Sequence, residues 1–182
     1  MAPQSELVVL VDNDGTPIGS HEKATVHTQT TPLHLAFSCH VFNEQGHVLV
    51  TRRALSKKTW PGVWSNSFCG HPGPDEAMVD AIARRAQDEL GITLTKIESL
   101  LPDFRYAATD ASGVVENEIC PVYTAFTAEQ PEIHPEEIEE FAWVNPAEFQ
   151  RAVAATPFAF SPWVGWQLAE IADAGIDYSR ER

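Results

Sequence analysis

The segment from residue 70 to residue 92 constrains the fold more than any other part of this 182-residue chain. Its apolar residues recur at the spacing of one helix face, at Val79, Ile82, Ala86 and Leu90. Pro74 and Asp75 mark the expected start of this helix, and Gly91 stands where a helix C-cap belongs. The segment therefore predicts a loop that leads into an amphipathic helix.

Strand-like segments precede and follow this helix. The expected strands are 6–12, a short second strand after the turn at 12–15, 34–43 with its hairpin partner 47–54, then 97–102, 103–109, 114–127 and 141–144. Two further helices are expected at 146–153 and 163–172. No repeat or linker interrupts this order, which predicts a single domain over residues 1–182 with an α+β fold, an α/β sandwich.

Composition excludes several classes of protein. Apolar residues make up 43% of the chain and charged residues 21%, which are ordinary globular values, and no apolar run approaches membrane-spanning length. The polar start MAPQSE lacks the basic and apolar regions of a signal peptide. The cysteines Cys39, Cys69 and Cys120 cannot all pair, so we expect reduced thiols in a cytoplasmic protein. We also expect the protein to be a monomer.

The formal net charge of −14 argues against a nucleic-acid partner, which needs a basic face. Residues 129–148 alone hold seven glutamates and no lysine or arginine, a pattern typical of a solvated face. Several of the cations cluster instead, at Arg52, Arg53, Lys57 and Lys58, with Lys23 upstream and Arg84 and Arg85 beyond. An acidic protein that binds an anion must gather its cations locally, so this cluster predicts an anionic ligand.

The segment 70–92 resembles the Nudix box, G-x5-E-x7-R-E-U-x-E-E-x-G-U, in which U is a bulky apolar residue. The match covers Gly70, Glu76, Arg84, Glu89, Gly91 and Ile92. The resemblance implies the Nudix fold, with a mixed β-sheet flanked by helices, and a diphosphate ligand. Two glutamates of the box are replaced, by Arg85 and Asp88.

Arg85 reverses the charge at a position where Nudix hydrolases gather magnesium. A guanidinium cannot bind a metal, but its fork matches the oxygens of a phosphate. Arg85 also lies one helical turn from Glu89, so an ion pair on the helix face is the alternative interpretation. The altered box therefore indicates the Nudix fold without ordinary hydrolase chemistry.

Candidate metal ligands lie outside the box. Glu116 and Glu118 are two residues apart, so in a strand they point to the same face. The histidines His27, His34 and His71 complete a mixed nitrogen and oxygen set, which suits six-coordinate manganese, magnesium or iron and is also compatible with zinc. Taken singly, each has an ordinary alternative as a hydrogen-bonded or solvent-facing side chain.

Six segments in this order resemble the type I isopentenyl-diphosphate isomerase family: LHLAF, VTRRALSKKTWPGVW, NSFCGHP, DFRYAATD, VENEICPV and FSPW. The resemblance places the Nudix-like core at about residues 32–166, with an N-terminal strand extension and a C-terminal helix. It implies that His27, His34, His71, Glu116 and Glu118 bind one divalent metal, Mn²⁺ or another ion such as Mg²⁺, Fe²⁺ or Zn²⁺. It also implies that Glu89 helps to bind a Mg²⁺ carried with the substrate diphosphate.

The chemistry of isopentenyl diphosphate explains why such a site needs two proton-transfer groups. Its terminal alkene has no carbonyl nearby, so protonation must come first and gives a tertiary cation, from which proton loss yields dimethylallyl diphosphate. The resemblance implies that Cys69 and Glu118 are these groups, with Tyr106 able to hydrogen-bond to Glu118 or relay its proton. A neutral thiol suits an apolar cleft, although a small core residue is the alternative for Cys69.

The expected substrate contacts come from cations and one aromatic ring. Lys23, Arg53, Lys57 and Arg85 form the predicted diphosphate set, whereas Arg52 and Lys58 are interpreted as solvated, because adjacent strand residues face opposite ways. Trp163 is expected to stabilise the cation through its π face, with plain core packing as the alternative. Two rival functions remain, a Nudix pyrophosphohydrolase acting on nucleotides and a non-catalytic Nudix-like binding module.

Overall fold

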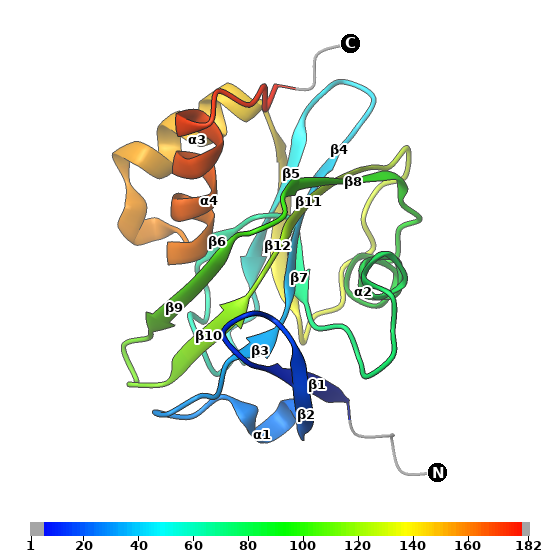
Figure 1. The fold of residues 1–182 in the computed structure, drawn as a ribbon. Coiled ribbons are helices and arrows are strands. Elements are labelled where there is room, and N and C mark those ends of the chain that lie inside the picture. The colour runs from blue at the N-terminus through cyan, green and yellow to red at the C-terminus, as the bar shows by residue number, and fades with distance from the viewer. Residues whose placement is uncertain (1–5, 180–182) are drawn as a thin grey trace.

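A computed structural model describes residues 6–179 of the chain. Residues 1–5 lie outside the described residues. The interpretation that the start MAPQSE is not a signal peptide falls mostly on these residues. Within them, no helix is long and apolar enough to cross a membrane. The fold consists of two β-sheets and the helices that cover them (Figure 1).

A seven-stranded sheet forms the centre of the molecule (Figure 1). Its main path runs through β12 (Ile138–Val144), β5 (Val48–Arg53), β4 (Phe37–Phe42), β11 (Val122–Phe126) and β8 (Thr95–Leu101). The short strands β6 (Trp64–Ser65) and β7 (Phe68–Gly70) pair with β5 and β4 respectively. β4 and β11 run parallel, while the other pairs of this sheet are antiparallel.

A five-stranded sheet lies beside the first, below it in Figure 1. Its order is β2 (Pro17–Glu22), β1 (Leu7–Val11), β3 (His34–Leu35), β10 (Val115–Ile119) and β9 (Arg105–Thr109). β3 and β10 run parallel. The chain thus passes twice from this sheet into the larger one, from β3 to β4 and from β10 to β11, and both passages run in the same direction.

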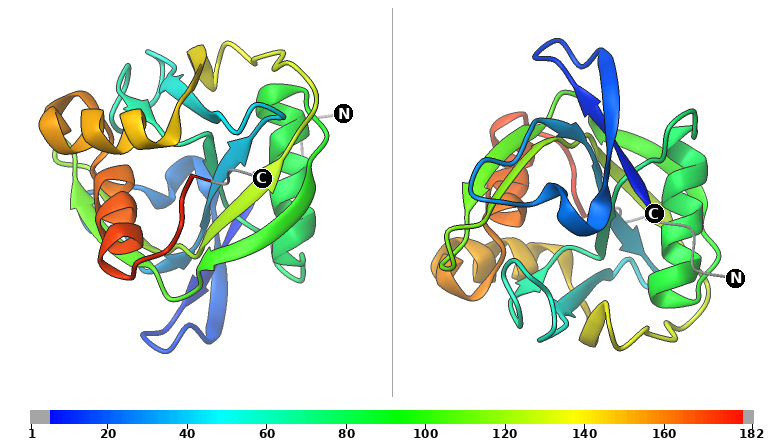
Figure 2. Two further views of the ribbon diagram at one scale, coloured as in Figure 1. Left: turned by 90° about the horizontal axis from the view of Figure 1, so that it is seen from above. Right: turned by 90° about the horizontal axis from the view of Figure 1, so that it is seen from below.

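Helices cover both faces of the central sheet (Figure 2). α2 (Met78–Leu90) packs on one face, where Phe37, Cys39 and Val41 of β4 point. α3 (Pro146–Ala155), the 3-10 turn η1 (Pro157–Ala159) and α4 (Pro162–Asp173) lie on the other, while α1 (Lys23–Val26) is a single short turn. β4 is buried on both faces because its side chains alternate between these two layers. The predicted α+β sandwich is confirmed.

The central helix begins later than its sequence pattern predicts. Asp75 has a φ of 62°, in the left-handed region, so the chain still turns there and α2 starts at Met78. Glu76, in that loop, accepts hydrogen bonds from the Gly73 N–H and from the guanidinium of Arg84. The C-terminal prediction is confirmed, since Gly91 caps the helix with a φ of 61°.

Two predicted strands are each divided between the sheets. Segment 34–43 breaks at Ala36 into β3 and β4, and segment 114–127 breaks at residues 120–121 into β10 and β11. Pro121 has no N–H to donate, so an uninterrupted ladder is impossible there. The two breaks lie side by side, because the Ala36 N–H donates to the Ile119 carbonyl and the Ser38 N–H to the Pro121 carbonyl.

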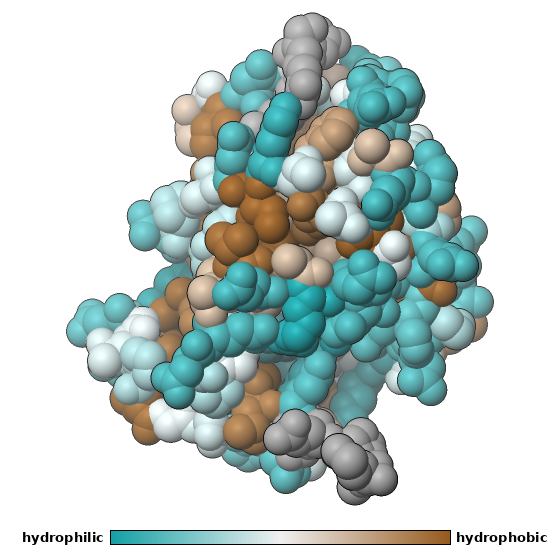
Figure 3. Space-filling view, turned by 90° about the vertical axis from the view of Figure 1, so that its right-hand side faces the viewer, coloured by the Kyte–Doolittle hydropathy of each residue, from teal (hydrophilic) through white to brown (hydrophobic). Residues whose placement is uncertain are grey.

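The surface on the α2 side is mostly hydrophilic, with its largest apolar area in the upper part of the view in Figure 3 and smaller ones at the lower left. This agrees with the acidic composition of the chain and with the exposed glutamates of segment 129–148. The substrate-sized cavity described next opens instead between the two sheets.

Candidate active site and metal centre

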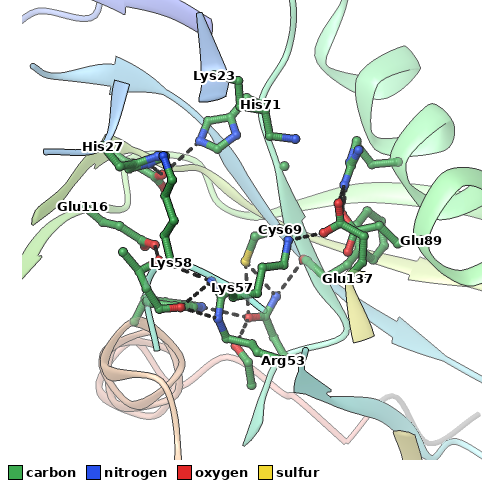
Figure 4. Close-up of a pocket in the computed structure, with 18 of the residues that line it drawn as sticks. Lys23, His27, Arg53, Lys57, Lys58, Cys69, His71, Glu89, Glu116 and Glu137 are labelled. Atoms are coloured by element: carbon green, nitrogen blue, oxygen red, sulfur yellow. Dashed lines mark hydrogen bonds and ion pairs between the residues drawn. The ribbon is translucent and has the colours of Figure 1, made fainter. Parts of the chain in front are cut away.

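A cavity of about 440 Å³ lies where the two sheets meet (Figure 4). Its lining includes every site residue predicted from the sequence except His34, which is fully buried directly behind the wall. Those lining residues are Lys23, His27, Arg53, Lys57, Cys69, His71, Arg85, Glu89, Tyr106, Glu116, Glu118 and Trp163. Residues far apart in the sequence therefore converge on one space.

Three histidines and one carboxylate form a compact group in the cavity wall. The ligand atoms of His27, His34, His71 and Glu118 all lie within 4.8 Å of one another. Oε1 of Glu118 lies 3.0 Å from His71 Nε2, 3.3 Å from His34 Nε2 and 3.8 Å from His27 Nε2. Strand register explains part of this arrangement, because Glu118 of β10 stands beside His34 of β3 and opposite Tyr106 of β9.

The histidine nitrogens of this group suit a divalent cation. Nδ1–H of His34 donates to the Pro32 carbonyl at 2.9 Å, which leaves the lone pair on its Nε2. The Nε2 atoms of His27 and His34 and Nδ1 of His71 are buried without a hydrogen-bond partner. Buried polar atoms normally have partners, so these nitrogens beside a carboxylate fit the ligands of a divalent metal ion.

Glu116 lies next to this group rather than within it. It shares the buried face of β10 with Glu118, as the alternation predicts. Its carboxylate accepts from the Thr59 hydroxyl and from the Tyr106 hydroxyl, the latter at 2.7 Å. The Tyr106 hydroxyl also lies 3.0 Å from Oε2 of Glu118, so it bridges the two carboxylates.

The charge states of these groups follow from burial and from their neighbours. Burial alone would raise the pKa of Glu118, but the neighbouring histidines His27, His34 and His71 hold it well below its usual range. Burial raises the pKa of Tyr106 well above its usual value, so this phenol stays protonated. Burial lowers the pKa of His71 to about 4, whereas for His34 the partnership with Glu118 outweighs burial and raises the pKa.

Cys69 presents its sulfur to the cavity from β7. Its Sγ lies 3.2 Å from Ser38 Oγ, across the β4–β7 pair, and 3.5 Å from both side-chain polar atoms of Asn66. Burial raises the pKa of the Cys69 thiol to about 12, so it holds its proton at neutral pH. Cys39 and Cys120 are fully buried in the core, and all three cysteines are unpaired.

Arg85 and Glu89 form the ion pair that their spacing allows, and this pair faces the cavity. Nη2 of Arg85 lies 2.5 Å from Oε1 of Glu89 and 3.3 Å from Oε1 of Glu137, which in turn pairs with Lys57. Burial raises the pKa of Glu89. Burial would also raise that of Glu137, but Lys57 and Arg85 hold it below its usual value. Figure 4 shows this cluster on the α2 side.

Gly70, the first residue of the altered box, allows β7 to approach the helix. A Cβ at this position would lie 2.7 Å from the Phe37 ring and 2.9 Å from Cγ of Arg85. Any side chain there would push Arg85 or the strand away. The glycine of the motif is therefore required by packing beside the cavity.

The remaining cations reach the cavity from three elements. Lys23 pairs with Glu6 at 2.6 Å, and Arg53 donates to the Thr59 carbonyl at 2.8 Å. Lys58, interpreted from sequence as solvated, is exposed, but it also lines the cavity and donates to the Ala24 carbonyl. Arg52 points elsewhere, as expected, and pairs with Glu140.

Trp163 belongs both to the core and to the cavity wall. Its side chain is only 1% exposed and its Nε1–H donates to Asn66 Oδ1 at 3.2 Å. The Arg53 guanidinium carbon lies 5.3 Å from the Trp163 ring centre, and the Tyr106 ring lies 5.7 Å away. The two interpretations of this tryptophan are therefore compatible.

Sequence reasoning missed several polar residues of this cavity, among them Lys58, Thr59, Asn66 and Glu137. Thr59, Asn66 and Lys58 lie inside segments that the family resemblance covers, so their positions beside Trp60 and Cys69 were a usable signal. Glu137 gave no signal, because it stands in the run of glutamates that was interpreted as a solvated face.

The chain is similar to proteins of known family. Residues 32–164 match the family model described as the NUDIX domain. The isopentenyl-diphosphate Delta-isomerase of Clavibacter sepedonicus is 62% identical over 168 residues, which cover 92% of this chain and 88% of that protein. The protein of the same description from Leifsonia xyli subsp. xyli is 55% identical over 182 residues, which cover 97% of each chain.

Solved structures show the same fold at lower identity. DR0079 from Deinococcus radiodurans superposes with a TM-score of 0.63 at 20% identity, over 82% of this chain and 90% of that one. The MutT protein from Methanosarcina mazei Go1 gives a TM-score of 0.61 at 18% identity, over 79% of this chain and 96% of that one. At such identities the likeness shows a shared fold alone.

Proposed function

Because the chain belongs to the isopentenyl-diphosphate Delta-isomerase family of NUDIX-domain proteins, we propose that the cavity around Cys69 and Glu118 is its active site. The chain is an isomerase that interconverts isopentenyl diphosphate and dimethylallyl diphosphate in isoprenoid biosynthesis. One observation carries the assignment of the site: a protonated thiol and an ionised carboxylate face the same cavity, beside a group that can hold a metal.

Cys69 and Glu118 are the two proton-transfer groups of this proposal. One adds a proton to the terminal carbon of isopentenyl diphosphate, and the other removes a proton after the tertiary cation has formed. Tyr106 donates to both Glu116 and Glu118, so it orients the carboxylate and can pass on its proton. The cavity is open on one side, so the bound substrate has to displace the water that would otherwise trap the cation.

The proposed metal ligands are His27, His34, His71 and Glu118, with Glu116 joining them by release from Thr59 or Tyr106. Their nitrogen and oxygen atoms suit Mn²⁺, or another divalent ion such as Mg²⁺, Fe²⁺ or Zn²⁺. A bound cation supplies positive charge that holds Glu118 ionised and fixed in place. Support comes from the unpartnered histidine nitrogens.

The diphosphate is assigned to the cationic end of the cavity. Lys23, Arg53, Lys57 and Arg85 all line it, and each is held by a carboxylate or carbonyl that a diphosphate can replace. Glu89 lies among these cations and is the proposed ligand of a Mg²⁺ that accompanies the diphosphate. Trp163 lines the cavity and is the proposed π partner of the carbocation, on a ring that already has the Arg53 guanidinium carbon 5.3 Å from its centre.

The remaining assignments concern the setting of the enzyme. Three unpaired thiols suit a reducing compartment, which supports a cytoplasmic location. The net charge of −14 supports the absence of a nucleic-acid partner, and we propose that the enzyme acts as a monomer on a small molecule.

Proton NMR of isopentenyl diphosphate with the protein and a divalent metal tests the proposed function, alongside an assay for released phosphate and pyrophosphate. We expect dimethylallyl diphosphate with neither ion released, because Arg85 replaces a metal-binding glutamate of the hydrolases. Phosphate release that matched substrate loss would favour a hydrolase. Substrate binding without either product would favour a non-catalytic module.

A further inference from the structure

A chain of polar side chains leads from Cys69 away from the cavity and into the core. Gln167 Nε2 donates to Ser38 Oγ at 2.8 Å, and Ser38 Oγ lies 3.2 Å from Cys69 Sγ. His40 Nε2 lies 3.0 Å from Gln167 Oε1, and His40 Nδ1 lies 2.7 Å from the Tyr178 hydroxyl. Ser38, His40 and Gln167 are fully buried, and none of the four lines the cavity.

The far end of this chain fixes the direction of its hydrogen bonds. Among the described residues, the Tyr178 hydroxyl has one hydrogen-bond partner, Nδ1 of His40, so its proton goes there. Burial lowers the pKa of His40 to about 4, which keeps the ring neutral with a single N–H. That hydrogen is therefore on Nε2 and is donated to Oε1 of Gln167.

The same direction continues to the sulfur. With Oε1 of Gln167 accepting from His40, its amide nitrogen must face Ser38, as observed. Ser38 Oγ then accepts from Gln167 and has its own proton to donate. The nearest acceptor is Cys69 Sγ at 3.2 Å, slightly closer than Cys120 Sγ at 3.4 Å.

The thiol proton of Cys69 has no strong partner inside the protein. Oδ1 of Asn66 lies 3.5 Å from Sγ, but it already accepts from Ser65 Oγ at 2.9 Å and from Trp163 Nε1 at 3.2 Å. A carbonyl oxygen has two lone pairs, and both are used. The hydrogen bond from the Cys69 thiol to Asn66 Oδ1, at 3.5 Å, is therefore weak, and the proton can turn from it into the cavity, where the alkene is expected.

We propose that Tyr178, His40, Gln167 and Ser38 are positioning residues that make Cys69 Sγ a hydrogen-bond acceptor and so turn its S–H toward the substrate. This inference rests on the proposed role of Cys69 in proton transfer. The four residues lie away from the proposed diphosphate contacts, so we expect their substitution to change kcat and to leave KM nearly unchanged. Its effect grows with proximity to the sulfur.

Three substitutions test whether the effect on kcat grows toward the sulfur. Tyr123→Phe is the matched control, because Tyr123 makes no side-chain hydrogen bond in the described structure and does not belong to this hydrogen-bonded series of side chains. Ser38→Ala removes the donor to sulfur and should lower kcat by about tenfold, the value of one ordinary hydrogen bond. Gln167→Leu should have a smaller effect, and Tyr178→Phe the smallest, of about twofold, because it only allows both ring tautomers of His40. KM, metal content and the control should stay at wild-type values.

Infrared spectroscopy gives a readout that is independent of turnover. The S–H stretching band of Cys69 is identified by its loss in Cys69→Ala. We expect it to shift in Ser38→Ala and Tyr178→Phe, and to keep its position in Tyr123→Phe. Lower melting temperatures with an unshifted band and unchanged kcat would overturn the proposal, and Tyr178→Phe decides the matter if Ser38→Ala does not fold. Full turnover of Cys69→Ser would instead refute the proposed role of Cys69 in proton transfer, while the S–H band of the wild type still reports the hydrogen bonds of its thiol.

Discussion

Arg85 and Glu89 stand one turn apart on α2, with Nη2 and Oε1 at 2.5 Å, and both side chains are more than nine-tenths buried. Arg85 also faces Glu137, while Lys57 pairs with that second carboxylate. Two cations and two carboxylates therefore balance at the edge of the cavity. A diphosphate with its magnesium adds charges of both signs, so Arg85 and Lys57 can exchange a carboxylate for a phosphate oxygen and remain paired.

Replacing Arg85 by glutamate should weaken substrate binding and should not produce an efficient hydrolase. The change removes a charge-assisted phosphate contact worth roughly 1.5–3 kcal/mol and adds repulsion from Glu89 and Glu137. We expect KM to rise about tenfold or more. Steady-state kinetics measures it, with Arg151→Gln as the control, because Arg151 pairs with Glu148 on the open surface. An unchanged KM would show that Arg85 serves only its helix ion pair.

Cys69→Ser should cripple turnover while the protein stays folded and retains its metal. An alcohol is a much weaker acid than a thiol, and loss of a positioned acid or base costs about 10²–10⁴-fold. Glu118→Gln should be equally damaging and should also lower metal content, since Glu118 lies in the metal group. Cys39→Ala is the control, because that thiol is buried on the α2 side of β4. Wild-type turnover in Cys69→Ser would refute the mechanism.

Removal of divalent metal should abolish turnover and lower the melting temperature. A ligand that binds only the folded state adds about 2.7 kcal/mol at a concentration one hundred times its Kd. Metal analysis and thermal unfolding of His34→Ala should reproduce the chelated wild type, because His34 belongs to the metal group. His21→Ala is the control, since His21 is exposed on β2. Full activity in a metal-free sample would exclude this centre.

Stability should fall as the pH drops from 6.5 to 4, in part because of His40. Burial lowers the pKa of this residue from 6.5 to about 4, so within that range the unfolded chain binds a proton that the folded protein does not. The contribution of neutral His40 to the free energy of unfolding is complete above pH 6.5 and is lost as the pH falls toward 4. It amounts to about 3 kcal/mol, at 1.36 kcal/mol for each pKa unit. Urea unfolding of wild type and His40→Gln at a series of pH values measures the difference. Parallel pH profiles for the two proteins would contradict it.

The sequence pattern predicted those parts of the fold that depend on the spacing of residues within one helix or strand. The burial of Ile82, Ala86 and Leu90 on α2, the Gly91 cap and the shared direction of Glu116 and Glu118 follow from spacing alone. Val79, predicted on the same helix face, is instead 49% exposed. The passages at Ala36 and Pro121 did not follow from spacing, because apolar residues continue through both breaks and only pairing between distant strands decides where each sheet ends. Segment 34–43 therefore looked like one strand.

The candidate site was predictable because the family resemblance indicated which residues, far apart in the sequence, belong to one site. Spacing alone left His27 and His34 as ordinary histidines, and their approach to Glu118 depends on the register of β3 and β10. The role of Glu137 could not be predicted from the sequence, because nothing in a run of glutamates distinguishes the one whose side chain pairs with Lys57. The reach of Lys58 to the Ala24 carbonyl likewise depends on where α1 lies.

The paired passages between the sheets also determine what engineering of this enzyme can change. Glu118 comes just before one passage, in the smaller sheet, while Ser38 comes just after the other and stands opposite Cys69 in the larger sheet. The relative placement of thiol and carboxylate is therefore set by backbone hydrogen bonds at Ala36 and Pro121. Libraries that vary the cavity lining other than Cys69 and Glu118 can alter which prenyl chain fits, but they should leave the relative placement of thiol and carboxylate unchanged, because these backbone hydrogen bonds do not depend on the varied side chains.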